Sequence, residues 1–406
     1  MKYISRSKYL QLLINYKDKD LAKVITGIRR SGKSVLLFDI FYDYLLSQGI
    51  DKEHIVKIDL ETARNKELRD PDKLYAFVTS KLTDDGRYYV FLDEIQLCPN
   101  FEDVVNGLRL DHNCDMYLTG SNSKLLSKEI NTKLRGRSIE IKMQPLSFGE
   151  YYSFVGGDKN QAFNDFLLFG GLPYLLDEQD ANRKIEYLRM MCDTVIAKDI
   201  IDRYQIRNEN LFNAVFEFLC SNIGSYVSVS KIVNTIKSNG YSAVTDDTVG
   251  NYVTYMCDAY LFYKAQRFDI KGKAYLKTQN KYYISDLGIR NSKLNYRQIE
   301  VTHSLENIIY LELIGRGYVV DIGKNNEKEI DFIAKSSRDL FYIQVAYSIV
   351  EPSKKEQELA SFKNLDDGYK KIVITMDNDP FTLLQNGYKK INVFDFLLND
   401  NALEEL

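Results

Sequence analysis

Residues 27–34 read Gly-Ile-Arg-Arg-Ser-Gly-Lys-Ser, which is a complete G-x4-G-K-S sequence. Glycines at this spacing let backbone N–H groups close around phosphate oxygens, and a helix that begins here points the positive end of its dipole at them. Lys33 is expected to reach the β- and γ-phosphates of ATP and Ser34 to ligate Mg²⁺. A chance glycine-rich turn is the alternative. The other residues expected to bind the nucleotide are Gly27, Arg29, Arg30, Ser31, Gly32 and Val35.

A second candidate lies further along the chain, where the apolar run Tyr88–Leu92 is followed directly by Asp93 and Glu94. This pattern predicts a buried strand that delivers two carboxylates at its carboxyl end. Together with a phosphate loop, it predicts that Asp93 holds Mg²⁺ through water and that Glu94 orients and polarises the attacking water. The alternative is that the two acids cap the next helix. A glutamate directly after the aspartate favours hydrolysis over nucleotide binding alone.

Small polar residues end another predicted strand, in the sequence MYLTGSNS over residues 116–123. Ligands of doubly wound sheets lie at the carboxyl ends of strands, so Ser121 or Asn122 is a candidate to contact the γ-phosphate or the attacking water. An ordinary turn that caps a helix starting at Lys124 is the alternative.

Two guanidinium groups follow in the sequence Leu134-Arg135-Gly136-Arg137. Either is a candidate arginine finger, which would stabilise charge on the transferred phosphate of the chain's own nucleotide or of a neighbour's. Arg137 is the more useful of the two in this role. A solvated pair of loop residues is the alternative.

The elements that must position these residues follow from the hydrophobic pattern. Short β-branched runs alternate with amphipathic, helix-length stretches from Lys23 to about residue 155. This alternation predicts an α/β fold with a doubly wound parallel sheet around the phosphate loop. Residues 156–208 are mostly helical in pattern. Residues 209–295 show three helical segments followed by two strand-like runs, the outline of a winged helix-turn-helix, and residues 296–406 predict a third core of mixed α/β type.

Composition limits the classes of function. Of the 406 residues, 45% are hydrophobic and 27% charged, which is typical of a globular chain with two or three domains. The 54 Lys and Arg nearly balance the 57 Asp and Glu, so the net charge of −3 excludes a chain-wide cationic surface for nucleic acid. Any contact with nucleic acid must use a local patch.

Cysteine and histidine usage excludes further kinds of site. The five cysteines are scattered without a CxxC pair, which argues against a disulfide framework and a thiolate zinc site. The three histidines are far apart, so a Ser/His/Asp triad has little raw material. No uninterrupted apolar stretch is long enough for a membrane span, and we expect a cytoplasmic protein that is not exported.

Basic side chains gather on the predicted hairpin of the winged helix, near the aromatic residues Phe268 and Tyr275. We expect a salt-sensitive, sequence-tolerant contact with the backbone of double-stranded DNA. A solvated or protein-docking hairpin is the alternative. The predicted recognition helix begins at Thr245 with two acids that would repel phosphates, so reading of base edges is not expected. The basic residues of the hairpin are Lys264, Arg267, Lys271, Lys273, Lys277 and Lys281.

Several of these motifs together resemble bacterial and archaeal AAA-type ATPases that carry a C-terminal domain of uncharacterised function. The motifs are GIRRSGKS, FLDEI, LTGS, LRGR with PLSFGEYY, FGGLPYLL, and the terminal ENIIYLELIGRGY, EIDFIA and YIQVAY, so the resemblance spans almost the whole chain. It implies an AAA-like P-loop core (residues 1–155), a helical lid (156–208), a winged helix (209–295) and a terminal α/β domain similar to PD-(D/E)XK restriction endonucleases (296–406). It also implies, loosely, a role involving DNA or defence.

The terminal segment departs from the nuclease pattern in its last element. Glu306 matches the helix acid of PD-(D/E)XK nucleases and Asp331 matches the strand aspartate. Where the (D/E)-x-K triple should follow, the chain has Gln344-Val345-Ala346. Glutamine is a poorer Mg²⁺ ligand than a carboxylate, and alanine cannot stabilise a hydroxide as lysine would. We therefore expect a degenerate, inactive site in a domain that serves binding or assembly.

The leading hypothesis is a Mg²⁺-dependent, ATP-hydrolysing AAA-like switch that uses the phosphate loop with Asp93 and Glu94 and works on or alongside DNA or a protein partner. The first alternative is a nucleotide-gated scaffold with negligible turnover, in which ATP sets the oligomeric state and Arg29 and Arg30 form a subunit contact. The second is a DNA nuclease that uses the helix and strand acids, with Glu329. No motif selects ATP over GTP.

Overall fold

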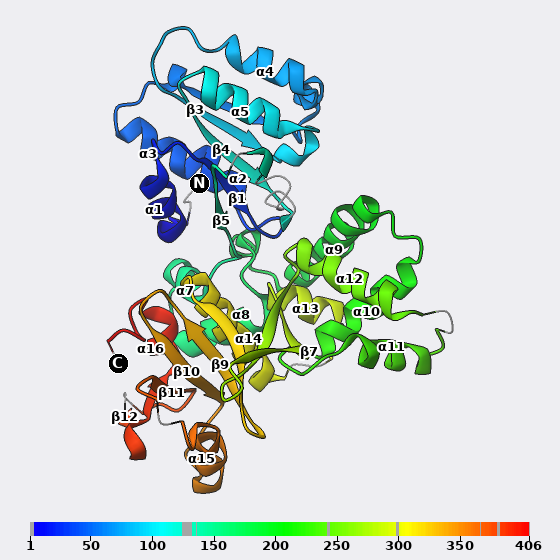
Figure 1. Ribbon diagram of the computed structural model, residues 1–406, viewed down its shortest axis with the longest axis vertical. Coiled ribbons are helices and arrows are strands. Elements are labelled where there is room, and N and C mark those ends of the chain that lie inside the picture. Colours follow the sequence, from blue (N-terminus) through cyan, green and yellow to red (C-terminus); the bar gives the residue numbers. More distant parts are fainter. Residues whose placement is uncertain are drawn as a thin grey trace. The chain divides into compact units, whose positions relative to one another are not determined.

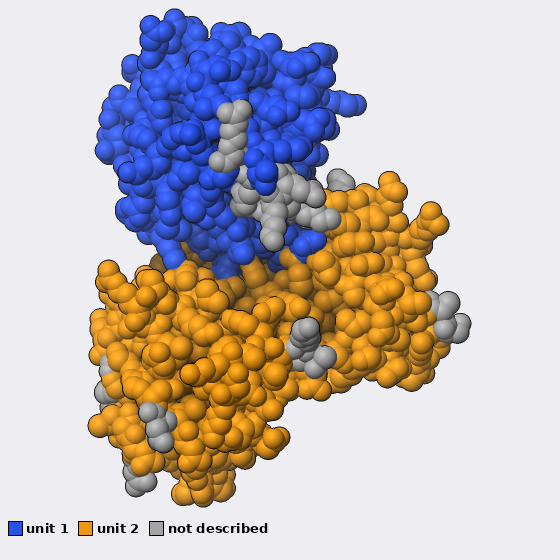
Figure 2. Space-filling model, viewed as in Figure 1, with its two compact units in different colours: residues 1–145, 258–260 blue, residues 146–257, 261–406 orange. Residues whose placement is uncertain are grey.

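The computed structural model describes residues 4–123, 132–134, 136–241, 244–297, 300–365, 367–379 and 382–405. The chain divides into two compact units, residues 1–145 with 258–260 and residues 146–257 with 261–406 (Figure 2). The segments expected as helical lid and terminal domain thus lie in the second unit, together with the expected winged helix except for residues 258–260. None of the described helices is long and apolar enough to cross a bilayer.

The first unit is built around a parallel five-stranded sheet with the strand order β2-β3-β4-β1-β5 (Figure 1). This confirms the predicted α/β sheet. Since every strand runs the same way, their carboxyl ends share one edge. The elements are α1 (Ser7–Tyr16), β1 (Ala22–Thr26), α2 (Lys33–Val35), η1 (Leu36–Phe41), α3 (Tyr42–Ser47), η2 (Lys52–His54), β2 (Ile55–Asp59), η3 (Ala63–Arg69), α4 (Pro71–Thr79), β3 (Tyr88–Asp93), η4 (Ile95–Leu97), α5 (Phe101–Asp111), β4 (Cys114–Gly120) and β5 (Ser138–Lys142).

Helices cover both faces of this sheet, which explains why its central strands are buried throughout and mostly apolar. All residues of β1, β3 and β4 are buried. Successive side chains point to opposite faces. Val90 and Leu118 pack with α4 and α5, whereas Phe91 and Tyr117 pack on the other face with α1 and the α2–α3 segment (Figure 1). The buried sheet is therefore a rigid platform for the loops at its carboxyl edge.

The second unit combines helices with an eight-stranded mixed sheet of order β12-β13-β11-β10-β9-β8-β6-β7. Its elements are α7 (Phe148–Val155), α8 (Lys159–Phe169), η6 (Pro173–Leu176), α9 (Ala181–Ile196), η7 (Ala197–Asp202), α10 (Glu209–Ser221), α11 (Val229–Ser238), α12 (Asp246–Asp258), β6 (Phe262–Asp269), β7 (Ala274–Ile284), α13 (Leu287–Lys293), α14 (Val301–Gly315), β8 (Val319–Asn325), β9 (Lys328–Lys335), β10 (Leu340–Ala346), α15 (Pro352–Leu359), η8 (Ala360–Phe362), β11 (Lys370–Thr375), β12 (Thr382–Leu383), η9 (Gln385–Gly387), β13 (Lys389–Asn392) and α16 (Val393–Leu398).

The β6–β7 hairpin follows three helices, as expected for a winged helix, but it also belongs to the terminal sheet. β6 pairs in parallel with β8, with Arg267 opposite Ile322 and Asp269 opposite Lys324. The hairpin and the terminal strands are therefore joined by backbone hydrogen bonds. The boundary expected near residue 295 therefore falls within one continuous sheet. The pattern of each segment taken separately does not predict this pairing.

The Gly170–Gly171 turn ends α8 and is held by residues at the start of α13. Gly170 has φ +77°, and a Cβ atom there would overlap the Asp286 carboxylate. Asp286 accepts hydrogen bonds from the backbone N–H groups of Gly171 at 2.7 Å and of Ile289 at 3.1 Å. Asn291 donates to the Leu167 carbonyl at 2.9 Å. The FGGLP sequence thus makes a close packing junction within the second unit.

Candidate nucleotide site

The phosphate loop connects β1 to α2 at the carboxyl edge of the first sheet, where the sequence predicts it. Gly27 has φ +147°, and a Cβ atom there would lie 2.0 Å from the Met143 carbonyl oxygen. Gly32, with φ +96°, directly precedes α2. Side chains at these two positions would clash or strain the backbone. The glycines are therefore required by the shape of the loop itself.

Lys33 lies inside this loop. Its side chain is buried, and the ammonium donates to the carbonyl oxygens of Gly27 and Ile28 at 3.0 Å each. The loop wraps around the amine and so holds a buried positive charge at the first residue of α2. This arrangement suits the binding of phosphate oxygens.

Ser34 and Asp93 are brought together although they are far apart in sequence. The Ser34 hydroxyl donates to Asp93 Oδ2 at 2.8 Å. A hydroxyl and a carboxylate in contact offer the oxygen donors that Mg²⁺ prefers, together with water and substrate phosphates. Among the described residues no three His, Cys, Asp or Glu side chains form a metal-binding group. The pair therefore fits Mg²⁺ that arrives with a nucleotide better than a metal caged by protein ligands alone.

Burial has a large effect on Asp93. It raises the pKa of this carboxyl to about 6, with smaller increases from Glu94 and Asp59, while hydrogen bonds from Thr119 and Ser34 oppose the rise. A positive ion beside Asp93 would reverse the effect of burial, because it favours the charged form. The carboxylate is thus poised to accept a cation.

Glu94 follows β3 in the left-handed region of backbone conformation, with φ 51°. Its backbone N–H donates to Thr119 Oγ1 at 3.0 Å. Its buried carboxylate accepts hydrogen bonds from the Gln96 side chain and, at 3.4 Å, from the Ser121 hydroxyl. The strained turn separates the directions of the two acids, and the hydrogen bonds fix the second one.

Thr119 is a positioning residue that the sequence did not single out. Its hydroxyl donates to Asp93 Oδ1 and accepts from the Glu94 backbone N–H, so one side chain connects both acids. The reason is strand order, because β4 lies between β1 and β3. The sequence LTGS pointed to the polar residues that follow the strand. The residue that connects the two acids, Thr119, is instead the penultimate residue of β4 itself.

Thr119→Val should weaken Mg²⁺-dependent ATP binding by about 10-fold, because loss of a group that orients a metal ligand typically costs roughly 10- to 100-fold. ATP titrations with and without Mg²⁺ measure the effect. Thr79→Val, on α4, is the matched control, since the Thr79 hydroxyl donates to the Tyr75 carbonyl of its own helix and lies outside the site. Equal Mg²⁺-dependent affinities of Thr119→Val and wild type would contradict this role.

ATP affinity in Mg²⁺ should fall as the pH is lowered through about 6, because Asp93 then takes up a proton that competes with the cation. The pKa is raised, so the loss lies below about 6 and the affinity is full above it. Affinities at several pH values test this. Asp93→Asn should flatten the Mg²⁺-dependent part of the profile, whereas the titration of ATP itself affects both proteins alike. A wild-type profile equal to that of Asp93→Asn would contradict the prediction.

The other residues expected at the site fall into two groups. Ser121 and Asn122 are buried at the carboxyl end of β4, and Ser121 contacts Glu94. The alternative helix cap falls in residues 124–131, outside the described residues. Arg29 forms an ion pair with Glu61 instead of pointing freely outward. Arg30 and Val35 are exposed beside the loop.

Arg137 is not brought to the phosphate loop of its own chain. Its carbonyl accepts from the backbone N–H of Ala22 at 2.9 Å, and its guanidinium donates to Asp20 at 2.7 Å. Both contacts lie where β1 begins, whereas the loop follows the other end of this strand. The expected finger for the chain's own nucleotide is therefore wrong for Arg137. Arg135 lies outside the described residues.

A second buried polar cluster lies in the second unit, and Lys281 of β7 is at its centre. Its ammonium contacts Glu306 at 2.9 Å and Glu329 at 2.6 Å. Burial lowers the pKa of Lys281, but Glu306, Glu329 and Asp331 outweigh it and leave the pKa raised. Lys281 was expected on a DNA-binding surface, and the structure corrects this, because its charge is buried and paired.

The acids of the predicted degenerate nuclease site do lie around this lysine. Asp331 accepts from the Val345 backbone N–H at 2.8 Å, and burial, followed by Glu306, raises its pKa. Gln344 donates to Glu358 at 3.0 Å. The buried ammonium of Lys281 contacts the carboxylate oxygens of Glu306 and Glu329, and a divalent ion at this site would need the same oxygens as ligands. The arrangement is thus a buried cluster in which one ammonium is paired with two carboxylates.

The hairpin retains fewer free cations than its sequence suggests. The Arg267 guanidinium lies over the Tyr226 ring at 4.6 Å and donates to Gln279 at 3.2 Å. The side chain of Lys277 lies outside the described residues. The exposed basic residues are Lys264, Lys271 and Lys273.

Comparisons with known proteins support an AAA-type fold for the first unit. Residues 19–152 match the AAA domain family, and residues 160–300 match a domain of unknown function (DUF8612). An uncharacterized protein from Haemophilus influenzae is 38% identical over 401 residues, which cover 97% of this chain and 98% of that protein. An uncharacterized protein from Methanocaldococcus jannaschii is 30% identical and covers 97% of this chain and 88% of its own length.

The solved structures that match this chain have low sequence identity and low TM-scores. The Orc1 protein of Aeropyrum pernix, determined in complex with DNA, is 14% identical, with a TM-score of 0.29 over 71% of this chain and 92% of that chain. A DNA polymerase III gamma subunit-related protein of Thermotoga maritima is 11% identical, with a TM-score of 0.29 over 62% of this chain and 99% of that chain. With the AAA domain match and the parallel sheet, the first unit is an α/β P-loop fold of AAA type.

Proposed function

This chain belongs to the protein family of its Haemophilus influenzae and Methanocaldococcus jannaschii relatives, with an AAA domain over residues 19–152, and we propose that it is a Mg²⁺-dependent ATPase. The observation that carries the proposal is the contact of the Ser34 hydroxyl with Asp93 Oδ2 at 2.8 Å, beside a loop that encloses Lys33. Residues with complementary roles in phosphate chemistry meet there from the helix α2 and the strand β3.

Each residue has a distinct part in the proposed reaction. The loop N–H groups and Lys33 bind the phosphates, and Ser34 and Asp93 hold Mg²⁺, which neutralises charge on the phosphates when it is bound. Glu94 accepts a hydrogen bond from the attacking water and polarises it. Thr119 and Ser121 hold the two acids in place. Asn122, buried after the same strand, is a candidate contact for the γ-phosphate.

Lys33→Ala should abolish measurable ATP binding, since the loop loses its only buried positive charge among the described residues. Fluorescent ATP titration monitors this directly. Lys57→Ala is a suitable control, because Lys57 lies on the neighbouring strand β2 and its amine binds the Phe38 carbonyl instead. ATP affinity that survives Lys33→Ala would count against the site.

We further propose that ATP hydrolysis is coupled to DNA binding through the β6–β7 hairpin. Lys264 on β6 and Lys271 and Lys273 in the β6–β7 turn are exposed, which suits contact with a phosphate backbone and not sequence reading. Hydrolysis would change the placing of the second unit and thereby its contact with DNA or a partner protein. The nucleotide-gated scaffold is the competing proposal, in which Arg30 beside the loop meets a second copy.

The terminal strands are proposed to be a nuclease-like domain without nuclease activity. Glu306 and Asp331 stand on a helix and a strand as such a site needs, but Ala346 stands in the place of the lysine, and Lys281 on β7 forms an ion pair with Glu306. This part of the chain is therefore assigned to binding or assembly.

A further inference from the structure

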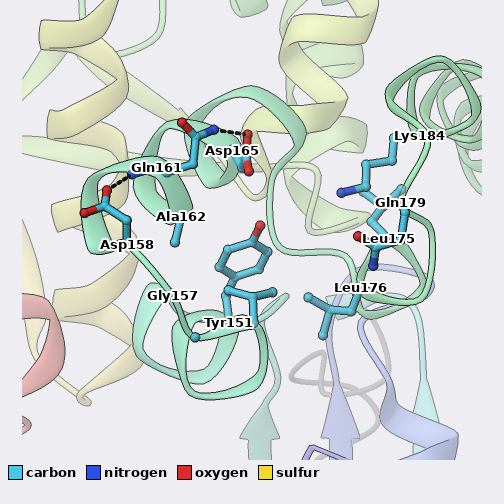
Figure 3. A pocket seen from close by; sticks show the side chains of 12 residues that line it. Tyr151, Gly157, Asp158, Gln161, Ala162, Asp165, Leu175, Leu176, Gln179 and Lys184 are labelled. Atoms are coloured by element: carbon cyan, nitrogen blue, oxygen red, sulfur yellow. Dashed lines mark hydrogen bonds between the residues drawn. The ribbon is translucent and has the colours of Figure 1, made fainter.

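A pocket of about 280 Å³ lies within the second unit, between α7, α8 and the segment from η6 to the beginning of α9 (Figure 3). Its lining is neither purely apolar nor of one charge. Asp165 comes from α8 and Lys184 from α9, and Figure 3 shows them on different sides of the opening. The side chains of Leu175 and Leu176 add an apolar surface. The pocket therefore offers complementary groups to a ligand with two opposite charges and an apolar part.

Tyr151 directs a hydroxyl into this pocket (Figure 3). Its side chain is only 7% exposed, and its ring packs against Phe166 with centroids 5.3 Å apart. Throughout the described ranges, the phenol oxygen has no hydrogen-bond partner. Burial, with a smaller contribution from Asp165, raises the pKa of Tyr151 to about 12, so the group keeps its proton. The Tyr151 hydroxyl is accessible from the pocket and can donate a hydrogen bond to what enters it.

The two charged groups are also available. Asp165 accepts a hydrogen bond from the Gln161 side chain at 3.2 Å, and the Lys184 ammonium lies 5.1 Å from the centre of the Phe169 ring. Neither side chain forms an ion pair with another described residue. Half-buried charges without a counter-ion are favourable partners for a charged ligand, because part of their desolvation has already occurred.

We propose that this pocket binds a small zwitterion, namely a free aliphatic amino acid. The ammonium group binds Asp165 and the carboxylate binds Lys184, with Tyr151 donating to a ligand oxygen. The side chain lies against Leu175 and Leu176. The binding does not require the phosphate loop, so the pocket is an additional sensor-type site outside the nucleotide-binding unit.

Calorimetric titration of the full chain with L-alanine, L-valine, L-leucine and L-methionine tests the ligand class. At least one of them should bind saturably to one site. For L-leucine the analogues with a single charge are isoamylamine and 4-methylpentanoate, and each should bind at least about 10-fold more weakly, because each loses one charge-assisted contact. Absence of saturable binding by all four amino acids would overturn the proposal, and so would equal binding of the analogues.

Variants locate the site. Asp165→Asn and Lys184→Met should each weaken binding about 10-fold, and Tyr151→Phe, which keeps the ring packing, about fivefold. Asp177→Asn changes an exposed acid next to η6 and should have no effect. Thermal unfolding identifies any variant that fails to fold. Binding that all three pocket variants leave unchanged contradicts the assignment, whereas Lys33→Ala should retain it and so separates this site from the ATPase.

Discussion

Glu94→Gln is expected to lower ATP turnover by at least about 100-fold while ATP binding stays near the wild-type level, because a positioned general base typically contributes 10²- to 10⁴-fold. The substitution keeps the size of the side chain and its contact with Ser121, which is 3.4 Å from Glu94 Oε2. It removes only the charge that polarises water. Parallel measurements of turnover and of ATP affinity separate the two effects.

The matched control for this prediction is Glu53→Gln, which makes the same change at an exposed position of the same unit. ATP turnover and ATP affinity should both be unchanged in Glu53→Gln. If Glu94→Gln hydrolyses ATP at the wild-type rate, Glu94 does not activate water. If it loses ATP binding as well, Glu94 acts on the structure of the loop and not on the reaction.

Lys281→Met should destabilise the second unit by about 3–5 kcal/mol, because it leaves carboxylates buried without their counter-ion. The lysine contacts Glu306 and Glu329, and it is 4% exposed. Methionine has similar length and fits the stem of the lysine. Denaturation followed by circular dichroism measures the loss, which should appear in the transition of the second unit.

Two further variants make this prediction specific. Lys264→Met changes an exposed lysine on the same hairpin and should alter stability by less than about 0.5 kcal/mol. Combining Lys281→Met with Glu306→Gln should restore part of the loss, because one of the uncompensated charges is then removed. A single variant as stable as wild type would show that the cluster does not need its lysine.

The sequence was sufficient to predict the parallel sheet and the residues of its phosphate loop. Strong local signals made this possible, since the loop demands glycines at fixed spacing and the central strands are mostly apolar on both faces. Asp93 and Glu94 stand at the end of such a strand, so their place at the sheet edge followed from topology.

Other features depended on pairings that a single sequence does not show. Thr119 connects the two acids only because β4 lies between the loop strand and the acidic strand. In the sequence, Lys281 has the pattern of an exposed cation on a hairpin. In the structure, β6 pairs with β8, and Lys281 is buried against acids of α14 and β9. Arg137 directly precedes β5 and contacts Asp20 before the beginning of β1. It therefore lies at the opposite edge of the sheet from the phosphate loop of its own chain.

The proposed ATPase activity can be tested by steady-state ATP turnover with Mg²⁺, measured with and without single- and double-stranded DNA and with Lys33→Ala as the blank. We expect turnover that Lys33→Ala abolishes and that double-stranded DNA increases. Lys33-dependent turnover that ignores DNA would retain the ATPase and remove the hairpin contact. Tight ATP binding without turnover in any of these conditions would contradict the account and favour the nucleotide-gated scaffold.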